Sequence, residues 1–193
     1  MAIAAMNSRA SVAGVKRTLS QCFGGPGFVA PSDKVNVAII GVGGQGRSNL
    51  RSLFYEADCQ VIAIADPCEE WDLSPFYYGG RAGRGPICAE IEETYRAKTP
   101  NYKCSVHEDF RVMLEKEKAI DAVLIATPDH LHAFIGLTVM KAGKHVYCEK
   151  PLTHNIREAR LMAKVASKAT SGASWPGAIP SSWSSDSQPR GRD

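Results

Sequence analysis

The 193-residue sequence has no membrane-length apolar run and no paired-cysteine motif. Its apolar runs stay well below the roughly 18 residues that a membrane-spanning helix requires. None of its six cysteines form a C-x-x-C pair, and several lie within apolar runs, where a free thiol packs as a small hydrophobic group. A membrane helix, a disulfide framework and a zinc site are therefore not indicated. We expect reduced thiols in a cytoplasmic protein.

Acidic residues are missing from the first 32 positions, which contain Arg9, Lys16 and Arg17. These three residues account for the formal charge of +3, because the remaining 20 of the 23 basic residues are balanced by 20 acidic residues. The rest of the chain is neutral, so composition gives no reason to expect binding to nucleic acid or to an anionic membrane. We interpret residues 1–33 as a disordered leader. The alternative is a degraded export signal, which would imply an exported protein.

Short apolar runs alternate with stretches of helical spacing from residue 34 onward. We predict strands within residues 35–40, 59–66, 102–106, 121–128 and 145–151. Predicted helices lie around Leu50, Leu53 and Phe54 and over residues 89–97, 107–117, 131–142 and 156–169. The strand runs are continuously apolar, which is typical of parallel strands covered on both faces. The predicted fold class is therefore α/β, a doubly wound parallel Rossmann sheet over residues 34–169 with helices on both faces.

Residues 170–193 differ sharply in composition from the segment before them. Residues 171–193 contain seven serines and three prolines, and Pro176 and Pro180 argue against a central strand where a doubly wound sheet places its next one. Two interpretations remain open: a disordered tail, and a non-native sequence produced by truncation or a shifted reading frame. We favour the second, because a natural boundary rarely leaves a sheet one strand short.

The sequence GVGGQG follows the first predicted strand and places Gly41, Gly43 and Gly46 in the spacing G-x-G-x-x-G. The first glycine allows a tight turn, the second lets the backbone approach a pyrophosphate, and the third lets the helix lie close to the strand. Asp66 ends the next strand, where a carboxylate accepts hydrogen bonds from the adenosine ribose. The alternative for the three glycines is an ordinary loop, and the alternative for Asp66 is a strand-end or turn residue before Pro67. No Arg or Lys closely follows Asp66 to pair with a 2′-phosphate, so we expect NAD rather than NADP.

Polar residues follow the fourth predicted strand, across the point where the strand order reverses and a ligand crevice belongs. Thr127 and Pro128 are expected to shape the turn there, and Asp129 to cap the next helix. His132 would face either the crevice or the solvent. As single residues, these are more often cap and surface residues than ligands. His130 and His132 do not indicate a metal site, because no further ligand has suitable spacing.

Glu149 and Lys150 end the fifth predicted strand, directly before Pro151. One interpretation is a charged strand end that faces solvent. The other places Lys150 near a nicotinamide, where its ammonium group would hydrogen-bond a substrate hydroxyl and assist proton transfer as hydride leaves the carbon. The two interpretations have about equal support from position alone.

Several segments together resemble the Gfo/Idh/MocA family of nicotinamide-dependent oxidoreductases. They are VAIIGVGGQG, IADP, DAVLIATPDHLHA, AGKHVYCEKPL and NIREARLMAK. The resemblance covers about residues 34–168, the N-terminal dinucleotide-binding domain of that family. The Glu-Lys-Pro triplet is its most specific marker.

The resemblance implies a role for each matching residue. The three glycines would cradle the pyrophosphate, Asp66 would hold the adenosine ribose, and Lys150 would be the catalytic residue that touches both cofactor and substrate. The remaining expected cofactor contacts are Gln45, Thr127, Pro128, His132 and Glu149.

The resemblance also implies an activity: NAD-dependent hydride transfer to or from a sugar, inositol or related polyol. The alternative is a nucleotide-binding fragment without turnover, because the C-terminal α/β substrate domain of that family has no counterpart here. Two further departures are the absent last strand of the nucleotide domain and a longer irregular segment at residues 67–88. The substrate, the reaction direction and the oligomeric state are not predicted.

Overall fold

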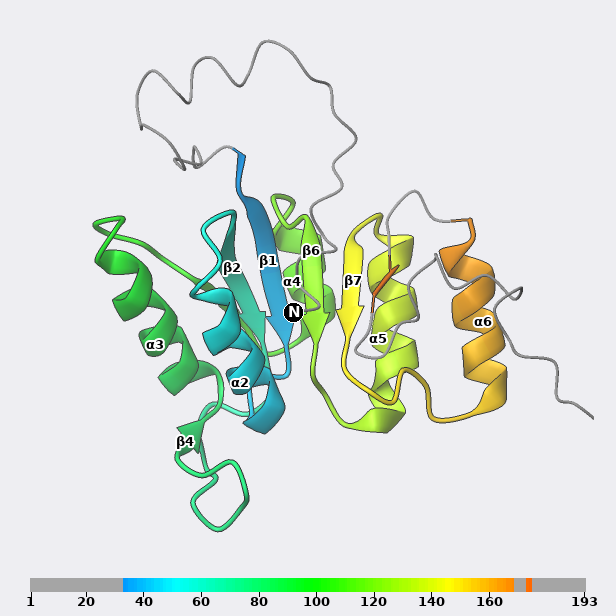
Figure 1. Cartoon of the computed structure of the whole chain (residues 1–193), viewed down its shortest axis with the longest axis horizontal. Coiled ribbons are helices and arrows are strands. Elements are labelled where there is room, and N and C mark those ends of the chain that lie inside the picture. The colour runs from blue at the N-terminus through cyan, green and yellow to red at the C-terminus, as the bar shows by residue number, and fades with distance from the viewer. Residues whose placement is uncertain (1–32, 169–172, 175–193) are drawn as a thin grey trace, which may run out of the picture.

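The computed structural model describes residues 33–168 and 173–174. Its main sheet has six parallel strands in the order β5–β2–β1–β6–β7–β8 (Figure 1). The strands are β1 (Val35–Ile40), β2 (Cys59–Ala65), β5 (Ser105–His107), β6 (Ala122–Ile125), β7 (His145–Cys148) and β8 (Ala173–Ser174). Because β1 pairs with both β2 and β6, the strand order reverses between β1 and β6, as the sequence predicted. The doubly wound α/β fold is confirmed.

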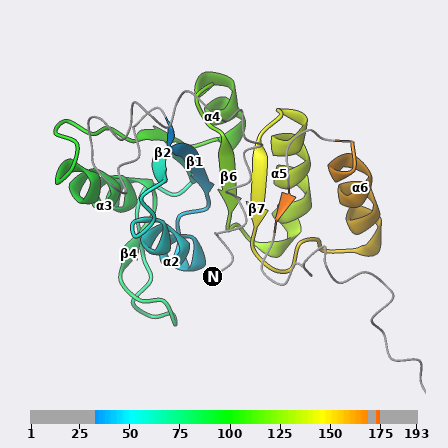
Figure 2. The same ribbon diagram turned by 45° about the horizontal axis from the view of Figure 1, so that its top comes forward.

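Five helices and one short hairpin complete the described structure. The helices are α2 (Gly44–Leu53), α3 (Arg84–Arg96), α4 (Phe110–Lys116), α5 (Asp129–Lys141) and α6 (Ile156–Ala166). The hairpin consists of β3 (Trp71–Asp72) and β4 (Arg81–Ala82), which pair in antiparallel fashion. It occupies part of the segment that the sequence suggested was irregular, and it extends below the sheet edge in Figures 1 and 2.

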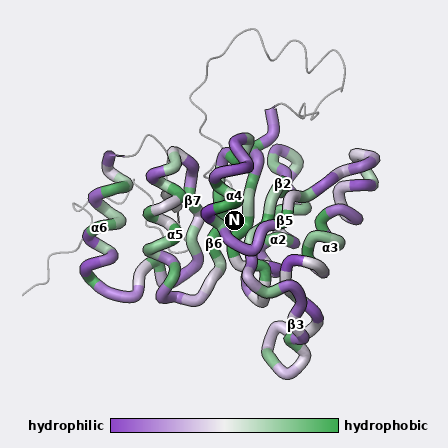
Figure 3. The backbone as a smooth tube through the Cα atoms, turned by 180° about the vertical axis from the view of Figure 1, so that it is seen from behind, coloured by the Kyte–Doolittle hydropathy of each residue, from purple (hydrophilic) through white to green (hydrophobic). Residues whose placement is uncertain are grey.

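Two apolar cores lie on opposite faces of the sheet. Helices α2 and α3 cover one face, where Leu50 and Ile91 pack against strand residues such as Ile39. Helices α4 and α5 cover the other face, where Met113 and Val139 join a second cluster. The central strands are largely hydrophobic in Figure 3, whereas many of the connecting segments are hydrophilic. Helix α6 packs beside α5 at one end of the molecule (Figures 1 and 2).

The expectation that the sheet stops one strand short is wrong, because β8 pairs with β7 through Val146–Ala173 and Tyr147–Ser174. This strand has only two residues, and both precede Pro176 and Pro180, so neither proline interrupts the pairing. The leader predicted for residues 1–33 lies outside the described residues except for Asp33. The tail predicted for 170–193 also lies outside them except for β8.

Some predicted helix boundaries are confirmed and others are not: α4 begins at Phe110 rather than at 107, and α6 ends at Ala166 rather than at 169. Gly143 ends α5 with φ +74°, and Asn155 caps α6 by accepting a hydrogen bond from the N–H of Glu158 at 3.0 Å. Helix α3 begins at Arg84, five residues before the predicted start, because proline is tolerated in a first helical turn. Asp129 does not cap α5: it is the first helical residue, and Pro128 occupies the N-cap position.

Two tyrosine hydroxyls form hydrogen bonds with the backbone of β2 in the part of the strand that does not pair with β5. Strand β5 pairs with β2 only from Ala63 onward. At Val61, the N–H donates to the hydroxyl oxygen of Tyr95 at 3.3 Å, and the carbonyl accepts a hydrogen bond from the hydroxyl of Tyr102 at 2.9 Å. Buried backbone groups left without partners would destabilise the fold, so these side chains act as a substitute for a strand.

Helix α6 has an unequal pattern of exposure. Met162 is buried, whereas Ile156 is 73% exposed. Helix α5 accounts for the difference, because Met162 reaches Gly136 on that helix. No helix within the described residues is long and apolar enough to cross a membrane.

Candidate functional site

The glycine-rich turn joins β1 to α2, and its glycines differ in what surrounds them. Gly41 has φ +84°, and a Cβ atom there would lie 2.7 Å from the carbonyl oxygen of Ala126. A Cβ atom on Gly46 would lie 1.9 Å from the carbonyl oxygen of Gly41. A Cβ atom on Gly43 would meet nothing within 4 Å. The turn is therefore tightly packed at both ends and open at its middle glycine, next to the N-terminus of α2.

Asp66 connects the end of β2 to this turn. Its Oδ2 accepts a hydrogen bond from the N–H of Val42 at 2.9 Å, and its Oδ1 accepts one from the N–H of Cys68 at 2.8 Å. Each carboxylate oxygen keeps a second lone pair, so the side chain can hold the turn and still accept hydrogen bonds from ribose hydroxyls. The structure thus brings Asp66 to the glycines, as the motif spacing predicted.

Arg84 lies beside Asp66, although 18 residues separate them in the sequence. Its Nη1 donates to the carbonyl oxygens of Asp66 and Pro67 at 3.0 and 2.7 Å. Its Nε pairs with the Glu69 carboxylate at 2.8 Å. This guanidinium group is already neutralised and held by backbone oxygens. Its distance along the chain from Asp66 explains why sequence spacing missed it.

Two cavities open at the carboxyl ends of the strands, and Thr127 lines both. The larger has a volume of about 600 Å³ and is mainly apolar. It lies beside Gly41 and Pro67, and its walls include Phe110, Val112, Leu131, Phe134 and Ile135. The smaller has a volume of about 200 Å³ and is more polar. Its walls are Gln45, Tyr78, Ala126, Thr127, Asp129, His132, Glu149 and Lys150.

The hydroxyl of Thr127, a residue that lines both cavities, is buried and has no hydrogen-bond partner among the described residues. A buried hydroxyl without a partner costs about 1–3 kcal/mol of stability. Such groups are rare in native proteins and call for an explanation. A polar group of a bound ligand would satisfy it.

His132 lies behind the smaller cavity and is 1% exposed. Its Nδ1 lies 2.6 Å from the carbonyl oxygen of Pro151, and its Nε2 lies 2.7 Å from the carbonyl oxygen of Thr127. The ring therefore connects the turn after β6 to the turn after β7. Both partners are acceptors, so the ring can donate to both only when both nitrogens carry protons. In this arrangement His132 positions the two turns, because both of its nitrogens are occupied.

Pro128 is exposed at the start of α5.

Glu149 and Lys150 are adjacent in sequence but differ in environment. Glu149 is 8% exposed, and its Oε1 accepts a hydrogen bond from Nδ2 of Asn49 on α2 at 2.6 Å. Lys150 is exposed and makes no ion pair with a described residue. The solvent-facing interpretation is therefore wrong for Glu149. The ammonium group of Lys150 remains available at the wall of the smaller cavity.

Cys148, on the same strand end, is fully buried. Burial raises the pKa of the Cys148 thiol to about 12, and the neighbouring Glu149 carboxylate adds to the shift. A thiol in this environment stays neutral and packs as a hydrophobic group. The five described cysteines are all free. No group of three or more His, Cys, Asp or Glu side chains suited to a metal ion occurs in the part of the chain that the structure describes.

Comparisons with known proteins support a nucleotide-binding role. Residues 86–173 match a family described as an oxidoreductase family with an NAD-binding Rossmann fold, Gfo/Idh/MocA. A glycosyl hydrolase family 109 protein of Akkermansia muciniphila is 30% identical over 133 residues, 68% of this chain and 25% of that protein. Inositol 2-dehydrogenase 1 of Saccharopolyspora erythraea is 29% identical over 137 residues, 69% of this chain and 34% of that enzyme.

A solved structure shows the same similarity. The crystal structure of an NAD-binding protein from Listeria innocua superposes with a TM-score of 0.51 and 27% identity, and the match covers 74% of this chain and 35% of that one. The chain thus spans about a quarter to a third of the length of the relatives that it matches.

Proposed function

This chain belongs to the Gfo/Idh/MocA oxidoreductase family through its NAD-binding Rossmann domain, and we propose that it binds NAD across the two cavities at the carboxyl edge of its sheet. The unpartnered hydroxyl of Thr127, a residue that lines both cavities, is the observation that carries this proposal. The open backbone at Gly43 would hold the pyrophosphate there, with Gln45 on the first turn of the helix beside it.

The two cavities suit the two halves of a dinucleotide. The larger, apolar cavity is lined by Ala65 and Pro67, the two chain neighbours of Asp66, and would take the adenosine, with the Asp66 carboxylate on the ribose hydroxyls. The smaller cavity would take the nicotinamide between Thr127 and Lys150. NAD is favoured over NADP, because Asp66 would repel a 2′-phosphate and the adjacent Arg84 is already paired with Glu69.

NAD, when bound, would accept or donate the hydride. The residues of this chain would bind the cofactor, orient the substrate and transfer a proton. Lys150 is the proposed catalytic residue, because it is exposed and lines the smaller cavity. It would hydrogen-bond the hydroxyl of a sugar, inositol or related polyol and take part in its proton transfer. Some relatives are inositol dehydrogenases, which supports a polyol substrate for the parent activity.

Binding without turnover is the second candidate, because the chain spans only about a third of its relatives. Fluorescence titration of the full chain with NADH, followed by an assay of NADH formation with a panel of polyols, separates the two. Enhanced NADH fluorescence with turnover that Lys150→Met abolishes supports the oxidoreductase. Enhancement without turnover supports the binding domain alone. Absence of NADH binding by the folded chain would overturn both.

A further inference from the structure

The β3–β4 hairpin brings an aromatic side chain to the cofactor site that no motif indicates. Tyr78 lines the smaller cavity together with Thr127 and Lys150, although it lies in the segment that departs from the family pattern. Its ring also borders a separate, more open cavity of about 490 Å³ along α2. Tyr78 therefore forms the wall between the proposed nicotinamide site and the outer surface of α2.

A glycine in the dinucleotide turn makes room for this ring. A Cβ atom on Gly44 would lie 2.5 Å from Cδ2 of Tyr78, well inside van der Waals contact. The spacing G-x-G-x-x-G leaves this position free, so the cofactor motif does not explain a glycine here. The hydroxyl of Tyr78 also lies 3.4 Å from Oε1 of Gln45, to which it donates. The ring is thus seated on the first turn of α2.

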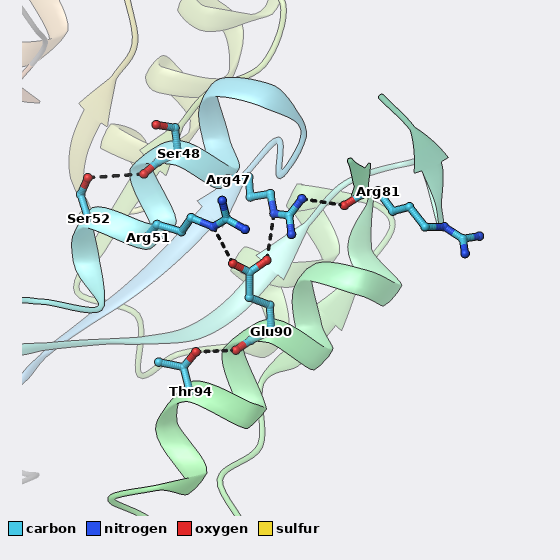
Figure 4. A network of polar contacts seen from close by, with 7 residues as sticks. All are labelled: Arg47, Ser48, Arg51, Ser52, Arg81, Glu90 and Thr94. Atoms are coloured by element: carbon cyan, nitrogen blue, oxygen red, sulfur yellow. Dashed lines mark hydrogen bonds and ion pairs between the residues drawn. The ribbon is translucent and has the colours of Figure 1, made fainter. Parts of the chain in front are cut away.

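A network of charged groups fastens the hairpin in this position (Figure 4). Nη1 of Arg47 donates to the carbonyl oxygen of Arg81 on β4 at 3.0 Å. Nε of Arg47 and Nε of Arg51 pair with the two carboxylate oxygens of Glu90 on α3, at 2.8 and 2.7 Å. Because Arg47 contacts both the hairpin and α3, the loop that carries Tyr78 is tied to the helices beside the site.

Part of the Tyr78 side chain remains accessible to a ligand. The side chain is 51% exposed, although one part of the ring already covers Gly44. An aromatic ring combines a large apolar surface with few rotatable bonds, which makes it an efficient contact for a flat ligand. Its neighbour Tyr77 is 96% exposed and lines the outer cavity but not the smaller one, and its ring packs edge-to-face on that of Tyr78 with 5.3 Å between centroids.

We propose that Tyr78 is a cofactor-contacting residue that closes the α2 side of the nicotinamide pocket, and that Gly44 is glycine in order to admit its ring. This inference rests on the proposed NAD binding and extends it to the hairpin. The ring would pack against the nicotinamide half of the dinucleotide and exclude water from that side of the pocket. Gly44 and Tyr78 would then act as one unit in binding.

NADH fluorescence titration of the full chain tests the proposal with a matched control one residue away. We expect Tyr78→Ala to weaken NADH binding about tenfold and Tyr78→Phe to weaken it about twofold or less, because the ring is the main contact. Tyr77→Ala should bind nearly like the wild type, because Tyr77 supports the edge of the Tyr78 ring but does not itself line the smaller cavity. Circular dichroism should show that all variants keep their helix content.

A double-mutant cycle then tests whether Gly44 and Tyr78 act together. Gly44→Ala should displace the ring and weaken binding about as much as Tyr78→Ala, and the double variant should be no weaker than either single variant. Additive losses would overturn the pairing. If the wild type binds NADH and Tyr78→Ala binds as tightly as Tyr77→Ala, the contact role is wrong while the proposed function stands. A folded wild type that does not bind NADH overturns both.

Discussion

The carboxylate of Asp66 accepts a hydrogen bond from the backbone N–H of Val42 at 2.9 Å, so the end of β2 holds the glycine turn that follows β1. The same side chain accepts from the N–H of Cys68. Asp66 thus has a structural function in addition to its proposed contact with ribose. A substitution there should change both the stability of the chain and its affinity for NADH.

We expect Asp66→Ala to lower the free energy of unfolding by about 1–3 kcal/mol, because two backbone N–H groups lose their acceptor. NADH binding should weaken in parallel. Asp66→Asn keeps one acceptor oxygen and should lose less stability. Urea unfolding followed by circular dichroism, together with NADH titration, measures both effects. Unchanged stability and affinity in Asp66→Ala would contradict both functions.

Two glycines of the turn should separate folding from binding. Gly46→Ala places a Cβ atom 1.9 Å from the carbonyl oxygen of Gly41, so we expect a loss of about 3 kcal/mol or more in unfolding free energy. Gly43→Ala meets no atom within 4 Å and should change stability by less than about 0.5 kcal/mol. It should nevertheless weaken NADH binding, because the added methyl group occupies the proposed pyrophosphate position. A Gly43→Ala chain that binds NADH normally would move the pyrophosphate elsewhere.

Thr127→Val should stabilise the free chain while weakening its complex with NADH. Valine has nearly the shape of threonine but lacks the buried hydroxyl that has no partner among the described residues. We expect the free energy of unfolding to rise by about 1 kcal/mol and NADH affinity to fall about tenfold. Thr127→Ser, which keeps the hydroxyl, is the control for binding. The opposite pattern, lower stability with unchanged affinity, would show that the hydroxyl serves the fold alone.

Tyr95 should make the chain sensitive to alkaline conditions. Burial is the main cause that raises its pKa to about 12, compared with about 10 in an unfolded chain. The folded state therefore holds the proton more tightly. The resulting stabilisation is complete below about pH 10 and is lost as the pH rises through about 12.

Tyr95→Phe should reduce this alkaline loss in melting temperature. It should also cost about 1–2 kcal/mol at neutral pH, because the N–H of Val61 loses its acceptor. Tyr55→Phe is a suitable control, since Tyr55 is 89% exposed. Thermal unfolding followed between about pH 8 and pH 11 checks both effects. Equal pH profiles for Tyr95→Phe and the wild type would show that another group is responsible.

Local patterns in the sequence were sufficient to predict most of the sheet. The apolar runs at 35–40 and 59–66 correspond to β1 and β2, and the run at 145–151 contains β7. These predictions succeeded because a buried parallel strand must be apolar on both faces, whatever surrounds it. The prediction failed for the start of α3, where a proline lies in the first helical turn, and for β8, which has only two residues and so shows no strand pattern.

Most of the candidate site could be located, but its contacts could not. Thr127, Glu149 and Lys150 were identified by their positions after strands, and the structure brings them to one cavity. The partner of Glu149 is Asn49, which is 100 residues away in the sequence. No local pattern connects such residues, because their distance depends on the register of several strands and the path of a helix.

The strand–helix order, the glycine turn and the carboxylate that follows β2 can be read from local sequence, because they depend on periodicity and on backbone conformation within a few residues. Which side chains are available at the site depends instead on long-range packing in the folded chain. It buried Glu149 against Asn49, occupied both nitrogens of His132 with carbonyl oxygens and left Lys150 exposed. It also brought Tyr78 onto Gly44, since a hairpin tied to α2 and α3 is positioned by long-range packing and charge pairing.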